Sequence, residues 1–216
     1  MFEEYEAASP RARYERLKDR EFALLRYRYL VESMVGDRAD AIRRLSDHLC
    51  NVGDFTRAPA SSRRRFHLSE PYGLLRHSVW VSDAYLELLR LHRIDMDPRS
   101  ARLCSLWHDA AKSGIGGIAP GDDYQPRYLK TSEDERRRTG EDYKYNPEML
   151  HLVLPVASLW LIGSFVPLTA KEAQIIVAHD SMYMPENRSY AHRMCPESVL
   201  LAQADESSLI YECEAA

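Results

Sequence analysis

The chain has 216 residues, which is enough for one well-buried domain and short for two. Its 29 lysine and arginine residues stand against 33 aspartate and glutamate residues, a formal net charge of -4. This balance excludes a general electrostatic attraction to nucleic acid or to an anionic membrane surface. A phosphate-bearing ligand would therefore have to be held by a local cluster of charge or by a metal ion.

Nothing in the sequence predicts a targeting signal or a membrane anchor. The first residues, 1–6, are acidic and lack the apolar core of a signal peptide. The longest apolar candidate for a membrane span, residues 150–166, is too short and contains Pro155. The four cysteines are scattered without paired spacing, so we expect reduced thiols and no zinc knuckle. Together these features predict a cytoplasmic protein that does not bind membranes.

The first part of the chain predicts two helices followed by a loop. Residues 11–34 are rich in helix formers, with apolar side chains loosely at helical spacing, and Gly36 ends this helix. A second, short helix is predicted over residues 40–52. The next segment, residues 53–70, is rich in Gly, Pro, Ser and Arg and is predicted to be a loop.

Two longer helices and a polar stretch are predicted next. The first helix covers residues 71–91, where apolar residues recur at helical spacing. The second begins after Asp97, a good N-cap that is followed by a proline at the first helical position. Residues 113–146 are then polar and rich in charge. In a compact domain a stretch of this length is usually a functional lid or a disordered segment.

The last part of the chain is again predicted to be helical. Residues 148–165 form a helix that is bent at Pro155, and a capping box at Thr169 starts another. A loop covers residues 180–193, and residues 196–211 form the last helix. No segment has a convincing strand pattern. We therefore predict an all-α fold.

The predicted helices divide into two parts. Residues 1–52 form an N-terminal helical extension, and residues 53–216 form a single helical bundle domain. Two roles are open for the extension: it packs on the domain, or it mediates a homodimer.

The pair His108-Asp109 is the most informative feature of the sequence. It lies in an apolar stretch, residues 103–112, that we predict to be a buried helix. A buried carboxylate without a partner is costly, so a cation is expected beside it. Lys112, one turn after His108, is either that cation or a group that binds an anion. A neutral imidazole next to a carboxylate is also a natural pair of metal ligands.

Three further polar residues occur on apolar helical faces: His77, His179 and Asp205. A single histidine in such a place is more often a core residue whose ring binds a backbone carbonyl. An aspartate within an apolar run is harder to explain in this way, because it is almost never buried without a partner.

The order of these residues along the chain resembles that of the HD superfamily of metal-dependent phosphohydrolases. The resemblance covers residues 55–208 and is closest to a branch that is common in phage and bacterial genomes. That branch has an Ala-Pro-Ala-Ser-like segment, then a Gly-Leu-Leu-x-His-Ser segment, and later a Pro-Leu-Thr-x-x-Glu-Ala helix that ends in histidine. The matching segments here are residues 58–61, 73–78 and 167–173, the last leading to His179.

The resemblance implies an HD-type domain in which His77, His108, Asp109 and Asp205 bind a divalent metal. Imidazole and carboxylate donors together suit manganese, iron, zinc, cobalt or nickel, and the type of ligand does not decide among them.

A second ion is also implied for some members of the superfamily, which hold it with two extra histidines. His179 fits one of these two positions. His151 is the only candidate for the other and lies about one turn away from the expected register. One ion and two ions are therefore both open.

The activity that the resemblance implies is hydrolysis of a phosphoester, in a nucleotide or short oligonucleotide, by a metal-bound hydroxide. Asp109 would act as a catalytic metal ligand, and Lys112 would stabilise charge on the phosphoryl oxygens. The alternative for Lys112 is a side chain that only reaches solvent from a helix end. Arg76 and Arg65 are candidates for binding the substrate.

Two other functions are compatible with the sequence. One is an accessory module that binds or processes nucleic acid and has a structural metal site; the arginines at 63–65 are its only support, and the negative net charge argues against it. The other is a sensor that binds a nucleotide without hydrolysing it. The arginines at 136–138 are flanked by acidic residues that largely cancel their field.

Overall fold

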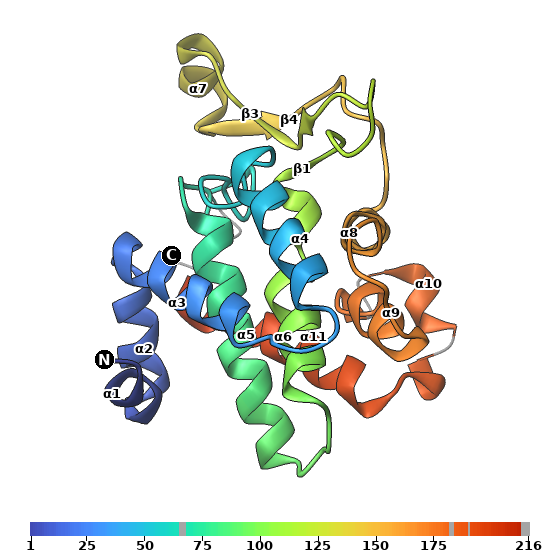
Figure 1. Ribbon diagram of the computed structural model, residues 1–216. Helices are drawn as coiled ribbons and strands as arrows, with labels where there is room; N and C mark the ends of the chain where they lie inside the picture. The colour runs from blue at the N-terminus through green and yellow to red at the C-terminus, as the bar shows by residue number, and fades with distance from the viewer. Residues whose placement is uncertain (65–67, 182–183, 190, 213–216) are drawn as a thin grey trace.

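The computed structural model describes residues 1–64, 68–181, 184–189 and 191–212. Most of these residues are helical, as predicted, and two short antiparallel strand pairs complete the regular structure (Figure 1). The prediction that strands are absent is therefore wrong, although only for one segment of the chain.

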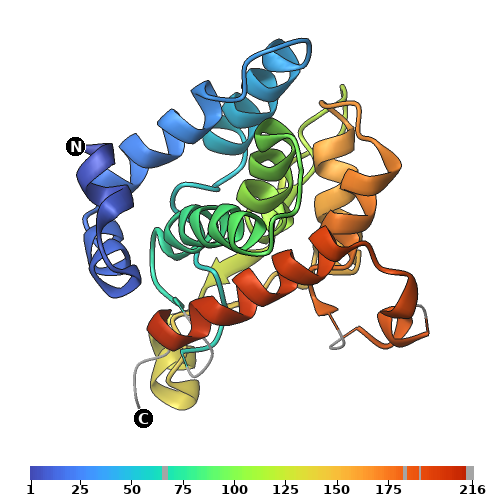
Figure 2. The ribbon, with the colours of Figure 1, turned by 90° about the horizontal axis from the view of Figure 1, so that it is seen from below.

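Helix α5 (Gly73–Leu91) lies at the centre of the fold. Three helices pack around it: α3 (Arg20–Glu32), α6 (Pro98–Trp107) and α11 (Pro196–Glu212). Figure 2 shows α11 running across α5. Because α5 is enclosed in this way, its buried apolar side chains lie on several of its faces and not on one stripe.

The N-terminal part of the chain contains more helices than the sequence predicted. The helices that accompany α3 here are α1 (Phe2–Ala7), α2 (Pro10–Leu17) and α4 (Ala39–Asn51). The single helix predicted over residues 11–34 is in fact α2 and α3, because the side chain of Asp19 accepts hydrogen bonds from two backbone N–H groups and starts a new helix. One continuous cluster of buried apolar side chains includes residues of these four helices and of α5, α6 and α11.

A buried ionic contact joins the N-terminal helices to α5. The guanidinium of Arg26 on α3 donates hydrogen bonds of 2.7 and 3.4 Å to Asp83 on α5, and the hydroxyl of Tyr5 on α1 donates one of 2.8 Å to the same carboxylate. Burial raises the pKa of Asp83, and the charge of Arg26 opposes this rise. Three aromatic rings, those of Phe2, Tyr5 and Tyr29, lie 5.2–5.3 Å from the guanidinium.

Helix α5 begins at a glycine because the preceding loop passes too close for a side chain. A Cβ at Gly73 would lie 2.3 Å from the carbonyl oxygen of Leu68 and 3.0 Å from the backbone nitrogen of Ala60. The next residue, Leu74, donates its N–H to the carbonyl of Ala58 at 3.0 Å. The loop is thereby held against the first turn of α5.

We expect Gly73→Ala to lower the free energy of unfolding by about 1–3 kcal/mol, because backbone atoms must move to admit the methyl group. For a chain of this size, the melting temperature should fall by roughly 2–4 °C for each kcal/mol that is lost. Gly163→Ala is the matched control, since a Cβ at Gly163 would meet nothing within 4 Å. Equal melting temperatures for the two variants would contradict the close approach.

The polar stretch 113–146 has regular structure of its own. Strands β1 (Gly114–Ile115) and β2 (Gln125–Pro126) pair with each other, as do β3 (Tyr128–Lys130) and β4 (Tyr143–Tyr145), and α7 (Glu133–Thr139) lies between the last two in the chain. The strands were missed because two or three residues are too few to show an alternating pattern. Figure 1 shows α7 and the β3–β4 pair together at one end of the molecule.

The C-terminal helices follow the prediction except that two of them lie in segment 180–193, which was predicted to be a loop, and that the bounds of others differ. They are α8 (Leu154–Gly163), α9 (Ala170–Val177), the short α10 (Pro185–Arg188) and η3 (Ala191–Arg193), and then α11. Pro155 lies in the first turn of α8, so it begins this helix and does not bend it, and residues 148–153 are not helical. The capping box at Thr169 is confirmed. In the described part of the chain, no helix has the length and apolar composition needed to cross a bilayer.

Candidate metal centre

Four side chains from distant parts of the chain converge in the interior. The ligand atoms of His77, His108, Asp109 and Asp205 all lie within 4.8 Å of one another. The Nε2 atom of His77 is 3.1 Å from Asp205 and 3.4 Å from Asp109, and the Nε2 atom of His108 is 3.6 and 3.4 Å from the same two carboxylates. These four residues are those that the sequence picked out, and the group that they form could hold a metal ion.

His108 and Asp109 owe their position to the end of a helix. They were predicted to lie within a buried helix, but α6 ends at Trp107, and His108 is its C-cap. The ring nitrogen Nδ1 of His108 lies 2.7 Å from the carbonyl oxygen of Ser105, one of the carbonyls that a helix end leaves without a partner. This hydrogen bond fixes the ring and turns Nε2 toward the group.

A second His-Asp pair repeats this arrangement. His179 and Asp180 follow the end of α9, and Nδ1 of His179 lies 2.6 Å from the carbonyl oxygen of Ile176. His179, Asp180 and Asp205 form a second set of ligand atoms within 4.8 Å of one another. From the sequence, Asp180 was expected only to be the first residue of a loop. The repeated His-Asp dipeptide was the signal that could have identified it.

His77 is held from both sides by a single helix. Its Nε2 atom faces Asp205 on α11, and its Nδ1 atom lies 3.0 and 3.1 Å from the two carboxylate oxygens of Glu212, seven residues further along the same helix. Residues seven apart share a helix face, which explains how one helix contacts both ring nitrogens. Glu212 was missed because the last helix was predicted to end at Tyr211.

The chemistry of these groups fits a metal ion. Each of the three imidazoles has an oxygen acceptor at Nδ1, so in its neutral form each presents the lone pair of Nε2 to the group. The Nε2 atoms of His77 and His108 lie 3.3 Å apart, a distance at which two lone pairs repel unless a cation or a proton lies between them. Asp109 Oδ1 and His179 Nε2 are buried and have no hydrogen-bond partner among the described residues. A cation would satisfy all of these atoms.

The carboxylates of the group are held in their ionised form. Burial raises the pKa of Asp109, but Lys112 and His108 lower it more, so it lies well below its usual range. Burial also raises the pKa of Asp205, and the hydrogen bonds and charges of His108 and His77 bring it well below its usual range. A metal ligand must be deprotonated, and these two carboxylates meet that condition at neutral pH.

Lys112 is the cation expected beside the buried carboxylate. It closes the short helix η1 (Ala110–Lys112), and its Nζ atom lies 2.5 Å from Asp109 Oδ2. Lys112 also lines a cavity of about 530 Å³ together with residues of the loop before α5 and of strands β3 and β4. Lys112 therefore connects the four candidate metal ligands, called the ligand group below, with a space that is large enough for a small molecule.

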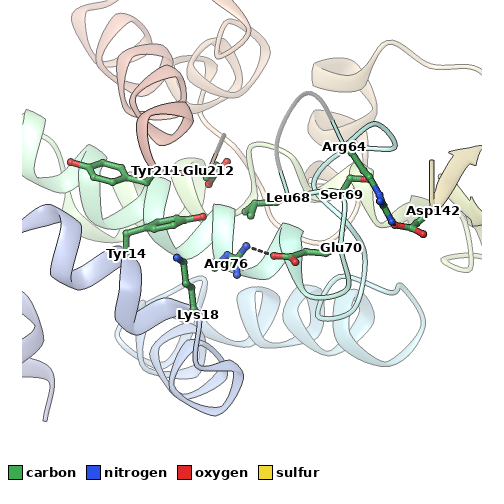
Figure 3. A pocket seen from close by; sticks show the side chains of 10 residues that line it. All are labelled: Tyr14, Lys18, Arg64, Leu68, Ser69, Glu70, Arg76, Asp142, Tyr211 and Glu212. Atoms are coloured by element: carbon green, nitrogen blue, oxygen red, sulfur yellow. Dashed lines mark hydrogen bonds and ion pairs between the residues drawn. The ribbon is translucent and has the colours of Figure 1, made fainter. Parts of the chain in front are cut away.

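The predicted substrate-binding residues are not brought together. Arg76 lies next to His77 on α5 but lines a different cavity, of about 540 Å³, where it forms an ion pair with Glu70 and lies over the ring of Tyr14 (Figure 3). Glu212 lines the same cavity, on the far side of His77 from the ligand group. Arg65 lies outside the described residues.

His151 belongs to neither set of ligands. It is exposed and lines a small pocket with Arg127 and Tyr145. The expectation that it completes a second metal site is not supported, because the segment before α8 is not helical and His151 does not reach the other ligand atoms. The residues whose ligand atoms lie near His179 are Asp180 and Asp205.

We expect the affinity for a divalent metal to rise with pH up to about 9. Burial lowers the pKa of His179, but the carboxylates of Asp109 and Asp180 raise it to about 9, so at neutral pH a proton must leave before Nε2 can bind an ion. One displaced proton corresponds to a tenfold gain in affinity per pH unit. Calorimetric titration with Mn²⁺ at pH 6, 7 and 8, in buffers that differ in ionisation enthalpy, measures the metal affinity and the number of protons released. A constant affinity without proton release would contradict this assignment.

Three comparisons, with protein-family models, with curated proteins and with solved structures, gave no match to this chain.

Proposed function

We propose that this protein is a metal-dependent phosphohydrolase of the HD type, which cleaves a phosphoester of a nucleotide or a short oligonucleotide. The observation that carries the proposal is the convergence of His77, His108, Asp109 and Asp205 with their lone pairs directed at one another. These are the residues that match the superfamily pattern, in the same order along the chain.

The roles of the residues follow from their contacts. His77, His108, Asp109 and Asp205 would hold a divalent ion of manganese, iron, zinc, cobalt or nickel. Such an ion supplies an activated water near neutral pH and neutralises charge on phosphoryl oxygens. Lys112 keeps Asp109 ionised and presents a positive charge to the cavity beside it.

A second ion is part of the proposal. His179 and Asp180 would bind it, and Asp205 belongs to both sets of ligand atoms. Asp109 also faces both sets, with Oδ2 3.4 Å from His77 and from His108 and Oδ1 3.4 Å from His179. A carboxylate that points one oxygen at each set is suited to bridging two ions.

The alternative is a nucleotide sensor or an accessory module in which the metal is structural. The burial of His77, His108 and Asp109 favours it. The side chains of Asp205 and Asp180, however, are 23% and 29% exposed, so one side of the ligand group is open to solvent. An open side is what a catalytic metal site requires.

Metal analysis of the purified protein and a hydrolysis screen together test the proposal. The screen uses nucleoside mono- and triphosphates, cyclic nucleotides and short oligonucleotides, each with Mn²⁺ and with excess chelator. We expect one or more bound ions and turnover that is lost with the chelator and in Asp109→Asn. Turnover that resists the chelator would contradict the metal mechanism. Bound nucleotide without turnover of any substrate would favour the sensor.

A further inference from the structure

The cavity beside Lys112 combines aromatic rings with positive charge. Three tyrosines, Tyr72, Tyr128 and Tyr143, and two lysines, Lys112 and Lys130, lie in its wall. The hydroxyl groups of these tyrosines make no hydrogen bond within the described part of the chain. Flat rings with free hydroxyl groups are suited to a ligand that is itself a planar ring with polar edges.

Tyr72 is held in a conformation that is unfavourable for its type. It is the residue before α5 and has φ +69° and ψ 5°, in the left-handed region that glycine and asparagine tolerate best. One face of its ring contacts the guanidinium of Arg20 at 4.1 Å, and the residue also lines the cavity. A strained non-glycine residue at the edge of a cavity is typical of a functional role for its side chain.

The two lysines place positive charge at different points of the cavity. Lys112 is already bound to Asp109 of the ligand group. Lys130, the last residue of β3, has no ion-pair partner among the described residues. Arg57 also lines the cavity, but its charge is matched by Asp54 at 2.7 Å. Within the described part of the chain, Lys130 is therefore the lysine of this cavity whose charge forms no ion pair.

We propose that this cavity binds the substrate and selects phosphoesters that carry a planar ring, as a nucleoside does. Tyr72 and Tyr128 contact the ring, and Lys112 and Lys130 contact the phosphoryl oxygens. This inference rests on the proposed function for its reaction, but the binding that it describes can be measured without turnover.

Calorimetry with adenosine 5′-monophosphate and ribose 5-phosphate tests the ring preference, because these ligands share the sugar and phosphate and differ in the base. We expect the protein to bind the nucleotide at least tenfold more tightly, as stacking on tyrosine provides. Tyr128→Leu and Tyr72→Asn should remove this preference and leave the affinity for ribose 5-phosphate within about twofold. Lys130→Gln should weaken both ligands alike. Tyr29→Leu, on the exposed surface of α3, is the control and should change neither.

Equal affinity for the two ligands would overturn the proposal, as would tyrosine variants that weaken both ligands to the same extent. A kinetic comparison shows which of the two proposals fails, the ring preference of the cavity or the phosphohydrolase activity. Thymidine 5′-(p-nitrophenyl phosphate) and methyl p-nitrophenyl phosphate release the same product, and only the first carries a nucleoside. If the protein loaded with Mn²⁺ hydrolyses neither compound, the result counts against the proposed phosphohydrolase activity. Whether the cavity prefers ligands with a planar ring is then decided by the calorimetry alone. Equal kcat/KM values for both would count against the cavity alone.

Discussion

Replacing Asp205 with asparagine is expected to lower the affinity for Mn²⁺ by roughly 100-fold or more and to reduce phosphoester hydrolysis by about 10³-fold. Asp205 is the one residue that belongs to both sets of ligand atoms in the described chain, so its substitution removes a donor from each. The amide keeps the size of the side chain but loses its charge. The fold should persist, because the Asp205 side chain is partly exposed and asparagine fills the same space.

Two further variants make this test specific. Glu206→Gln changes the charge of the same helix by the same amount at an exposed position and should leave metal affinity unchanged. Asp180→Asn removes a donor from the second set only. If it lowers the number of bound ions from two to one, two ions are bound in the native protein. Undiminished metal binding in Asp205→Asn would show that the convergence of these side chains does not form a metal site.

The largest effect on stability is expected from Arg26→Met. The substitution removes the guanidinium that is hydrogen-bonded to the buried carboxylate of Asp83 and leaves the hydroxyl of Tyr5 and the more distant charge of Arg13, and a buried charge that loses its partner costs about 3–5 kcal/mol. Helices α1 to α3 should detach from α5 more readily as a result. Denaturant unfolding followed by circular dichroism measures the loss, and amide hydrogen exchange should locate it in the first 32 residues.

The double variant Arg26→Met, Asp83→Leu is the control for this prediction. It removes both charges, and an apolar pair of similar volume is often as stable as the ion pair that it replaces. We therefore expect it to recover most of the lost free energy of unfolding. A double variant that is no more stable than Arg26→Met would show that Arg26 acts through its packing on the surrounding rings and not through Asp83.

The sequence predicted local features well where one or two residues determine them. Asp97 and Thr169 cap the helices that they were expected to cap, because their side chains accept hydrogen bonds from backbone N–H groups two or three residues away. Asp19 does the same, yet it was overlooked, because the helix formers on both of its sides gave the appearance of one helix. The strands between residues 114 and 145 could not be predicted, since their pairing depends on contacts with other segments.

In the candidate site too, residues that a local pattern marks were predicted, and contacts between distant helices were not. His77, His108, Asp109 and Asp205 were found because polar side chains interrupt apolar helical faces. Lys112 was expected beside Asp109, but Glu212, the partner of His77 Nδ1, was not found, because that contact is set by how α11 lies across α5. The seven-residue spacing that brings Glu212 to His77 carries meaning only once the course of α11 is known. The cavity beside Lys112 could not be predicted either, as its walls come from loops far apart in the chain.

The place of Asp205 and Glu212 on α11 has a consequence for biosynthesis. A nascent polypeptide that has left the ribosome only as far as α10 already contains both His-Asp dipeptides, but it lacks the carboxylates that flank the imidazole of His77. Binding of the ion should therefore coincide with the packing of α11 on α5. An ion that binds only the docked state protects it by mass action, by about 2.7 kcal/mol at a hundred times its dissociation constant. If the group binds an ion as proposed, α11 should be cleaved more readily by proteases when that metal is scarce.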